Sequence, residues 1–200
     1  MTLAEALTRL NSPAAALPRL WLVTDGRRLP DPLPVLARLP AGSGVILRHH
    51  DLPDRAALAR RVAGLCRRRR LVLLVANDWR LAAAVGADGV HLAEGLARCG
   101  RNAPLLRWRR GRRALLSVAA HSPRALTWAR RLGADAALLS PVFATASHPG
   151  QPGLGGVRFG LWSRRAHLPV IALGGVTAAT WKSLPAGSAH GGAALAGLGP

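Results

Sequence analysis

Short, mainly apolar runs recur along the whole chain. The clearest are 71–76 and 136–139, in which every position is apolar. Continuous apolar runs of this length are typical of parallel strands that are buried on both faces. Eight runs predict strands, the last of them weakly because it mixes strand and glycine signals: 20–24, 44–48, 71–76, 87–92, 114–118, 136–139, 169–173 and 189–196.

The segments between these runs carry helical spacing and helix-end signals. Asp54 precedes a helix whose apolar stripe consists of Leu58, Val62, Leu65 and Cys66, the spacing of a face that packs on a core. Segment 93–113 is poorly patterned, apart from a short helix near its middle. The other predicted helices are 3–10, 34–39, 80–85, Ser122 to Gly133, 159–166 and Thr177 to Leu184.

This alternation of strands and helices predicts an α/β fold. A single, compact (β/α)8 TIM barrel with a reduced last unit fits 200 residues at the lower limit of its size. An open doubly wound sheet would usually carry a glycine-rich turn after its first strand, and Thr24-Asp25-Gly26-Arg27 is not one. Gly86-Ala87-Asp88 and Gly133-Ala134-Asp135 repeat at about two βα units, which favours the barrel. We expect an N-terminal lead-in with a short helix at 1–19 and the barrel at 20–198.

The net charge of +19 comes almost entirely from arginine, because Lys182 is the only lysine. The densest arginine runs lie near the ends of predicted helices or connectors, where cations complement the helix dipole. In a parallel barrel these positions fall on the face opposite the active site. We therefore interpret them as a solvated basic surface rather than a specific nucleic-acid footprint. The runs are 67–70, 107–113, 130–131 and 164–165.

Two further features bear on location and redox chemistry. No apolar run approaches the roughly 20 residues that span a bilayer, and the first residues lack the basic region and apolar core of a signal peptide. We expect a cytoplasmic protein with no membrane partner. Cys66 and Cys99 form no metal-binding spacing, and Cys66 continues an apolar helix face, so we expect a buried free thiol.

Candidate chemistry gathers after the predicted strands. The run 136–139 breaks at Pro141 into a long loop rich in hydroxyl groups and glycine, and the carboxyl end of a strand is where an α/β barrel carries its chemistry. His121 also follows a strand and is a candidate acid–base group, because imidazole titrates near neutrality; the alternative is that it caps a helix. We interpret His49 and His50 as solvated turn residues and His91 as a packed barrel histidine.

Seven motifs at the strand ends occur in a specific order: Leu22-Val23-Thr24-Asp25, Ile46-Leu47-Arg48, Ala76-Asn77-Asp78, Gly86-Ala87-Asp88-Gly89-Val90-His91-Leu92, Ala120-His121-Ser122, Ser140-Pro141-Val142-Phe143-Ala144-Thr145-Ala146-Ser147 and Val170-Ile171-Ala172-Leu173-Gly174-Gly175-Val176. In this order they resemble thiamine phosphate synthase and its TenI relatives. The resemblance implies a (β/α)8 barrel in thiamine biosynthesis. The synthase joins a pyrimidine diphosphate to a thiazole phosphate with Mg²⁺ and releases diphosphate, whereas a TenI tautomerase aromatises the thiazole phosphate.

The resemblance also implies roles for individual residues. Backbone N–H groups of Gly174 and Gly175 would hold the thiazole phosphate, helped by Gly191 and Gly192 where the last unit begins. His121 matches the acid–base histidine of the tautomerase. The remaining substrate contacts would come from Arg48, Asn77, Thr145, Ser147 and His148, and the Mg²⁺ ligand would be Asp78, which could equally be an ordinary helix N-cap.

The chain departs from the synthase pattern in the diphosphate and metal machinery. Replacing lysine with a mostly neutral histidine removes charge, and charge-assisted hydrogen bonds contribute roughly 1.5–3 kcal/mol each. A single carboxylate is also weak support for Mg²⁺. The synthase has glutamine at Ile46, lysines near His50 and at His148, serines at Ala119 and Ala196, and a second metal-binding aspartate near Leu96, where only Glu94 is close.

Three functions remain open from the sequence. The first is an enzyme of thiamine biosynthesis, either a transferase like the synthase or a tautomerase that uses His121. The second is a non-catalytic barrel that binds a phosphorylated ligand, and the third is nucleic-acid association that rests on charge alone. The first two require the strand ends to meet around one small anion-binding hollow. The oligomeric state is left open.

Overall fold

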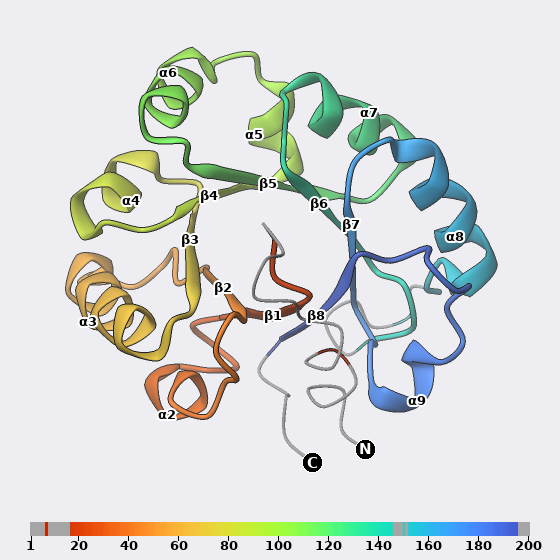
Figure 1. Cartoon of the computed structure of the whole chain (residues 1–200), viewed down its shortest axis with the longest axis horizontal. Helices are drawn as coiled ribbons and strands as arrows, with labels where there is room; N and C mark the ends of the chain where they lie inside the picture. The colour runs from red at the N-terminus through yellow and green to blue at the C-terminus, as the bar shows by residue number, and fades with distance from the viewer. Residues whose placement is uncertain (1–6, 8–16, 146–149, 151, 196–200) are drawn as a thin grey trace.

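The structure is a computed structural model that describes residues 7, 17–145, 150 and 152–195. Within these residues, eight parallel strands form a closed barrel in the order β1 to β8, with the helices outside the ring of strands (Figure 1). This confirms the predicted (β/α)8 barrel. The strands are β1 Leu20–Val23, β2 Gly44–Leu47, β3 Val72–Ala76, β4 Gly89–Leu92, β5 Leu115–Ala120, β6 Ala136–Leu139, β7 Val170–Leu173 and β8 Gly191–Leu195.

The strands are mainly apolar because both of their faces are buried, and the polar side chains of His91 in β4 and Ser117 in β5 are paired with each other. In β2, Ile46 points into the barrel with Trp21 and Ile171, whereas Val45 and Leu47 pack outward against the helices. Successive side chains of a strand alternate between the two faces, so both alternating sets must be apolar. β8 closes the ring by pairing with β7 and β1, although its sequence pattern was the weakest.

Side-chain caps fix several helix starts. The carboxylate of Asp54 accepts the N–H of Ala57, and the hydroxyl of Ser122 accepts the N–H of Ala125. Each bond satisfies a donor that the first helical turn leaves free. The helices are α2 Leu33–Leu36, α3 Arg55–Arg69, α4 Trp79–Val85, α5 Glu94–Arg98, α6 Ala103–Arg112, α7 Pro123–Arg131, α8 Gly155–Ala166 and α9 Ala178–Trp181.

Several predicted helix bounds were wrong. Segment 93–113 holds two helices, α5 and α6, instead of one short helix. The apolar pattern of this segment is poor because few of its side chains are buried. Asn102 joins the two helices, because its side-chain amide donates to the carbonyls of Leu96 and Ala97 at 3.1 and 3.3 Å. α8 begins at Gly155, and α9 ends at Trp181. The predicted helix 3–10 lies outside the described residues except for Leu7, which is fully buried.

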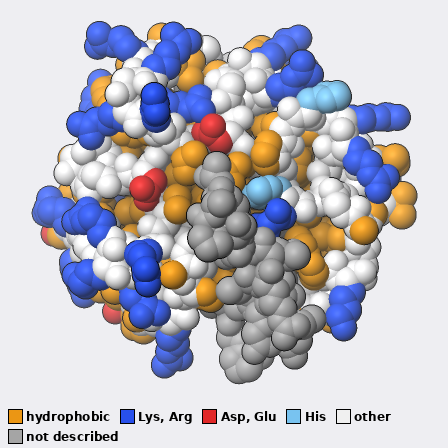
Figure 2. Space-filling view, viewed as in Figure 1, with side chains coloured by type: hydrophobic (Ala, Val, Ile, Leu, Met, Phe, Trp, Pro, Cys, Tyr) orange, Lys and Arg blue, Asp and Glu red, His pale blue; other side chains and the backbone are white. Residues whose placement is uncertain are grey.

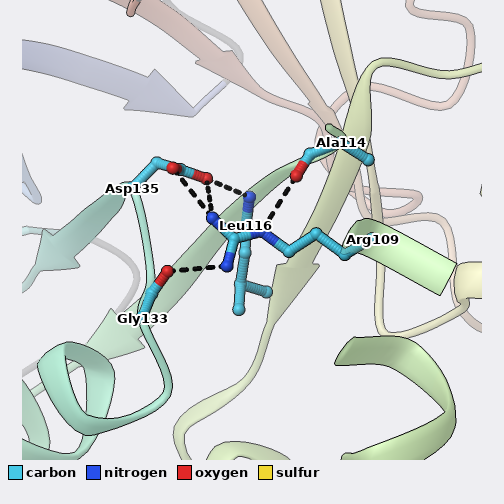
Figure 3. Close-up of polar contacts among 5 residues, drawn as sticks. All are labelled: Arg109, Ala114, Leu116, Gly133 and Asp135. Atoms are coloured by element: carbon cyan, nitrogen blue, oxygen red, sulfur yellow. Dashed lines mark hydrogen bonds and ion pairs between the residues drawn. The ribbon is translucent and has the colours of Figure 1, made fainter. Parts of the chain in front are cut away.

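The repeated Gly-Ala-Asp motif ties neighbouring strands together at their starts. Asp88 accepts the N–H of Leu73 at 2.7 Å, and Asp135 accepts the N–H of Leu116 at the same distance. Arg109 forms two 2.8 Å bonds to the carboxylate of Asp135 and donates to two main-chain carbonyls, those of Gly133 and Ala114 (Figure 3). The repeat therefore supports the barrel and does not belong to a binding site.

Arginine side chains lie in the last turns of α3, α6, α7 and α8. Helices of a βα unit run back from the carboxyl ends of the strands, so these turns lie at the opposite face of the barrel. Figure 2 shows one face of the molecule with basic side chains around its outer edge. Some of these arginines are not simply solvated: Arg67 donates to the carbonyl of Val85 at 3.1 Å. Among the described helices, none is long and apolar enough to cross a membrane.

Candidate active site

A cavity of about 450 Å³ opens at the carboxyl ends of the strands. Each of the eight strands contributes a residue at or just after that end, for example Val23 from β1, His91 from β4 and Leu195 from β8. The volume suits a small ligand. The cavity also lies where barrel enzymes place their reacting groups.

The loops that follow β6 and β7 meet beside this cavity. The N–H of Val142 donates to the carbonyl of Leu173, and the N–H of Phe143 donates to that of Gly174, both at 3.0 Å. The approach is so close that a Cβ atom on Gly174 would lie 2.9 Å from the Cα of Pro141. The two segments on which the predicted anion site depends are therefore in direct contact.

The glycine corner itself has a left-handed backbone. Gly174 and Gly175 have φ of 91° and 64°, a region that side chains disfavour. The carbonyl of Gly175 accepts the hydroxyl of Thr180 at 2.9 Å. Within the described part of the chain, neither glycine donates its N–H in the hydrogen bonds of turns and loops. Since Gly174 lines the cavity, this corner can offer N–H groups to an anion.

His121 lies at the cavity and is paired with Glu94. Its Nδ1 is 2.9 Å from Oε2 of Glu94, and the same oxygen accepts the backbone N–H of His121 at 3.1 Å. The side chain of His121 is 48% exposed and that of Glu94 22% exposed. The imidazole is thus held on one side and open to solvent and ligand on the other, which suits proton exchange.

Basic groups dominate the other side of the cavity. Arg48 lines it together with Arg27 and Arg28. Partial burial alone would raise the pKa of Asp25, but the backbone donors of Arg28 and Arg27 and the charge of Arg48 outweigh it, and the pKa is lowered. Asp25 thus stays ionised at neutral pH and offsets part of the positive charge.

Two cavity histidines are kept neutral at neutral pH. Burial lowers the pKa of His50, and the charges of Arg55 and Arg48 lower it further. Burial lowers the pKa of His91 to about 3, and its Nδ1 lies 2.8 Å from the Ser117 hydroxyl. His91 is a packed histidine, as predicted, although it also lines the cavity. Neither ring adds a formal charge for a ligand at neutral pH.

The interpretation of His49 as a solvated turn residue was wrong, because it is only 2% exposed. Its Nε2 donates to the carbonyl of Leu29, and its Nδ1 faces the hydroxyl of Thr24, each at 3.0 Å. That hydroxyl also accepts the backbone N–H of Arg48 at 3.1 Å. A buried imidazole is tolerated when both nitrogens are satisfied. This network fixes the start of the loop that carries Arg48.

The residues after β3 are largely engaged in structure. Asn77 lines the cavity, but its side-chain oxygen accepts the N–H of Ala93 at 2.8 Å. Asp78 caps α4 through the N–H of Leu81 and lies 3.9 Å from Arg55. It faces a separate hollow between β4 and α6. Asp78 is therefore the N-cap of α4, the alternative to a metal ligand that the sequence left open.

These contacts bear on whether the residues present fit Mg²⁺, which prefers carboxylate oxygens. Asp78 lines the separate hollow and caps α4, and Glu94 is hydrogen-bonded to His121. Among the residues that the structure describes, no three His, Cys, Asp or Glu side chains come close enough to hold a metal ion. The described residues therefore hold no preformed magnesium centre, although Asp25 and Glu94 each bring a carboxylate to the cavity.

The other predicted ligand residues divide into three groups. Thr145 lines the cavity, whereas Ser147 and His148 lie outside the described residues. Gly191 and Gly192 start β8, at the amino end of the strand, and the N–H of Gly192 donates to the carbonyl of Arg19 at 2.8 Å. The structure does not bring these two glycines to the cavity, because the carboxyl end of β8 reaches it instead.

Sequence reasoning gave no site role to Glu94 or Asp25. Asp25 directly follows a predicted strand and Glu94 lies two residues after one, so the rule that barrel chemistry lies at strand ends could have singled them out. Nothing in the sequence pairs Glu94 with His121. That contact exists because β4 and β5 are neighbours, with Leu92 opposite Val118.

The fold and the cavity define a (β/α)8 barrel of the enzyme type, with a basic, ligand-sized hollow at the carboxyl ends of its strands. More specifically, the chain belongs to the thiamine monophosphate synthase family, whose family model matches residues 20–198.

Two relatives agree with this membership, and one solved structure matches the fold. The chain is 34% identical over 192 residues to the thiamine-phosphate synthase of Salinispora tropica, covering 92% of this chain and 90% of that protein. It is 35% identical over 194 residues to the thiamine-phosphate synthase of Salinispora arenicola, with the same coverage of both chains. The solved thiamine phosphate pyrophosphorylase of Pyrococcus furiosus matches the fold with a TM-score of 0.68 at 19% identity, covering 88% of this chain and 85% of that one.

Proposed function

We propose that this barrel is an enzyme of thiamine biosynthesis that binds a thiazole phosphate in the strand-end cavity and isomerises it by proton transfer through His121. Family membership and fold support the biosynthetic role. The observation that carries the finer proposal is that His121, paired with Glu94, lines the same cavity as the corner at Gly174. One cavity thus combines an acid–base group with an anion-binding corner.

The phosphate would bind at the glycine corner. Backbone N–H groups bind phosphate well because they carry partial positive charge, and a glycine has no side chain that would block the approach of the phosphate. Arg48 lines the same cavity and adds a full positive charge. Hydrogen bonds to charged groups contribute roughly 1.5–3 kcal/mol each, so two or three of them anchor a small ligand.

The reaction would be a tautomerisation. His121 takes a proton from one position of the thiazole and returns it to another, so the substrate keeps all of its atoms. Such a step needs one group that titrates near neutrality and reaches the ring. It needs neither a second substrate nor diphosphate binding. It is therefore compatible with the missing synthase lysines.

The synthase reaction is the second candidate. It is favoured by the names of the relatives in Salinispora, at 34% and 35% identity over most of both chains, and by the place of Arg48 and Asn77 in the cavity. The contacts of Asp78 argue against it, because its carboxylate caps α4. A non-catalytic binder of the same ligand is the third outcome.

The deciding experiment compares two assays on the purified protein. Aromatisation of the thiazole phosphate is followed by ultraviolet absorbance, and diphosphate release is measured with the pyrimidine diphosphate and Mg²⁺ present. We expect aromatisation that is abolished by His121→Ala while ligand affinity is kept, and that survives in the control His167→Ala, on an exposed residue after α8. Robust diphosphate release would establish the synthase instead. Binding without either reaction would establish a non-catalytic protein.

A further inference from the structure

Glu94 is the first residue of α5 and makes two hydrogen bonds to one neighbour. Its Oε2 lies 2.9 Å from Nδ1 of His121 and 3.1 Å from the backbone nitrogen of the same residue. Its other oxygen, Oε1, lies 3.9 Å from a guanidinium nitrogen of Arg98, one turn later in α5. The carboxylate is therefore held in place by the main chain of the residue whose ring it contacts.

We propose that Glu94 is a positioning residue that fixes the tautomer of His121, a role that rests on the proposed function of that histidine. An ionised carboxylate can only accept hydrogen bonds, so Nδ1 must carry the proton. In the neutral ring Nε2 is then unprotonated and is the nitrogen left to take a proton from a substrate. After that transfer the carboxylate also stabilises the imidazolium.

The barrel sets this pairing by bringing the ends of β4 and β5 together. Leu92 lies opposite Val118 in the register of these strands, and the paired residues follow shortly after each strand end. Because the carboxylate of Glu94 also accepts the backbone N–H of His121, the Glu94 side chain stays in place even if the imidazole ring of His121 rotates. A purely structural bond would anchor the loop equally well but would not matter to the protonation of the ring.

Three variants separate these roles. Glu94→Gln keeps an oxygen that can accept from both nitrogens but removes the charge, and Glu94→Ala removes both. Arg98→Ala is the matched control on the same helix, because Arg98 contacts only the other oxygen of Glu94 at long range. The tautomer is read from ¹⁵N chemical shifts of the labelled imidazole, with His121→Ala assigning the signal. This readout needs no activity. Turnover is measured in parallel with the thiazole phosphate.

We expect the wild type and Glu94→Gln to show the Nδ1–H tautomer and Glu94→Ala to shift toward Nε2–H. Glu94→Ala should lower kcat by about 10- to 100-fold, part of what a general base supplies, with KM changed less than about threefold; Glu94→Gln should recover most of that loss. Unchanged tautomer and unchanged kcat in Glu94→Ala would overturn the inference. If the wild type shows no turnover, the proposed function fails and the tautomer measurement alone decides whether Glu94 positions the ring.

Discussion

Replacing Gly175 with alanine tests the phosphate corner, and Gly187→Ala is its matched control. Both glycines have a left-handed backbone, with φ of 64° and 70°, so each substitution costs about 1–2 kcal/mol of stability. Only the first meets an obstacle: its Cβ would lie 2.5 Å from the carbonyl oxygen of Ala144 and 2.8 Å from Cβ of Phe143, whereas Gly187 has open space. The overlap should add about 1–3 kcal/mol.

The overlap should also appear in ligand affinity. To relieve it, the corner must move relative to the loop after β6, which carries its backbone N–H groups away from a bound phosphate. Loss of one such bond costs roughly 1.5–3 kcal/mol, which raises the Kd by about 10- to 150-fold. The Kd is measured by calorimetric titration with the thiazole phosphate, at a temperature below the melting temperature of each variant. Equal Kd values for Gly175→Ala and Gly187→Ala would refute the assignment of the phosphate to this corner.

Three further predictions concern stability and reactivity. Arg109→Ala should lower the free energy of unfolding in urea by about 2–3 kcal/mol, because its guanidinium joins a carboxylate and two carbonyls; an equal loss in the exposed control Arg110→Ala would contradict this. Burial lowers the pKa of His91 from 6.5 to about 3, so between these two pH values the unfolded chain binds a proton at His91 that the folded chain does not. The free energy of unfolding should therefore fall as the pH drops from 6.5 toward 3. A His91→Gln variant whose stability falls equally steeply would disprove this origin. Burial raises the pKa of Cys66 to about 12, so a thiol reagent should label exposed Cys99 in the native protein and Cys66 only after unfolding; native labelling of both would show that Cys66 is accessible.

The strands could be predicted because the barrel buries both of their faces. β2 shows why: Ile46 fills the interior while Val45 and Leu47 pack against helices, so the whole run had to be apolar. Segment 93–113 gave no such signal. Its helices bury few side chains, and α6 buries only Leu105. Their positions depend on bonds from side chains to the backbone, such as the bond from the amide of Asn102 to the carbonyl of Leu96. The periodicity of apolar residues does not reveal such bonds.

The site could be predicted only as far as the strand ends define it. The rule that barrel chemistry follows the strands predicted a site role for His121 and for the loop that carries Thr145, and the resemblance added Gly174; the structure places all three at one cavity. The resemblance assigned Gly191 and Gly192 to the phosphate site, but both lie inside β8, where a Cβ atom on Gly191 would overlap the carbonyl of Arg19. Neither the rule nor the resemblance revealed the partner of His121, since that contact depends on the neighbour relation of two strands.

The central claim is that the corner at Gly174 and Gly175 holds the phosphate of a thiazole that His121 reaches. A crystal structure of the protein with bound thiazole phosphate tests it most directly. We predict phosphate oxygens within hydrogen-bond distance of the two glycine nitrogens and the thiazole ring beside Nε2 of His121. A phosphate bound elsewhere, or a ring beyond the reach of that nitrogen, would contradict the proposed function.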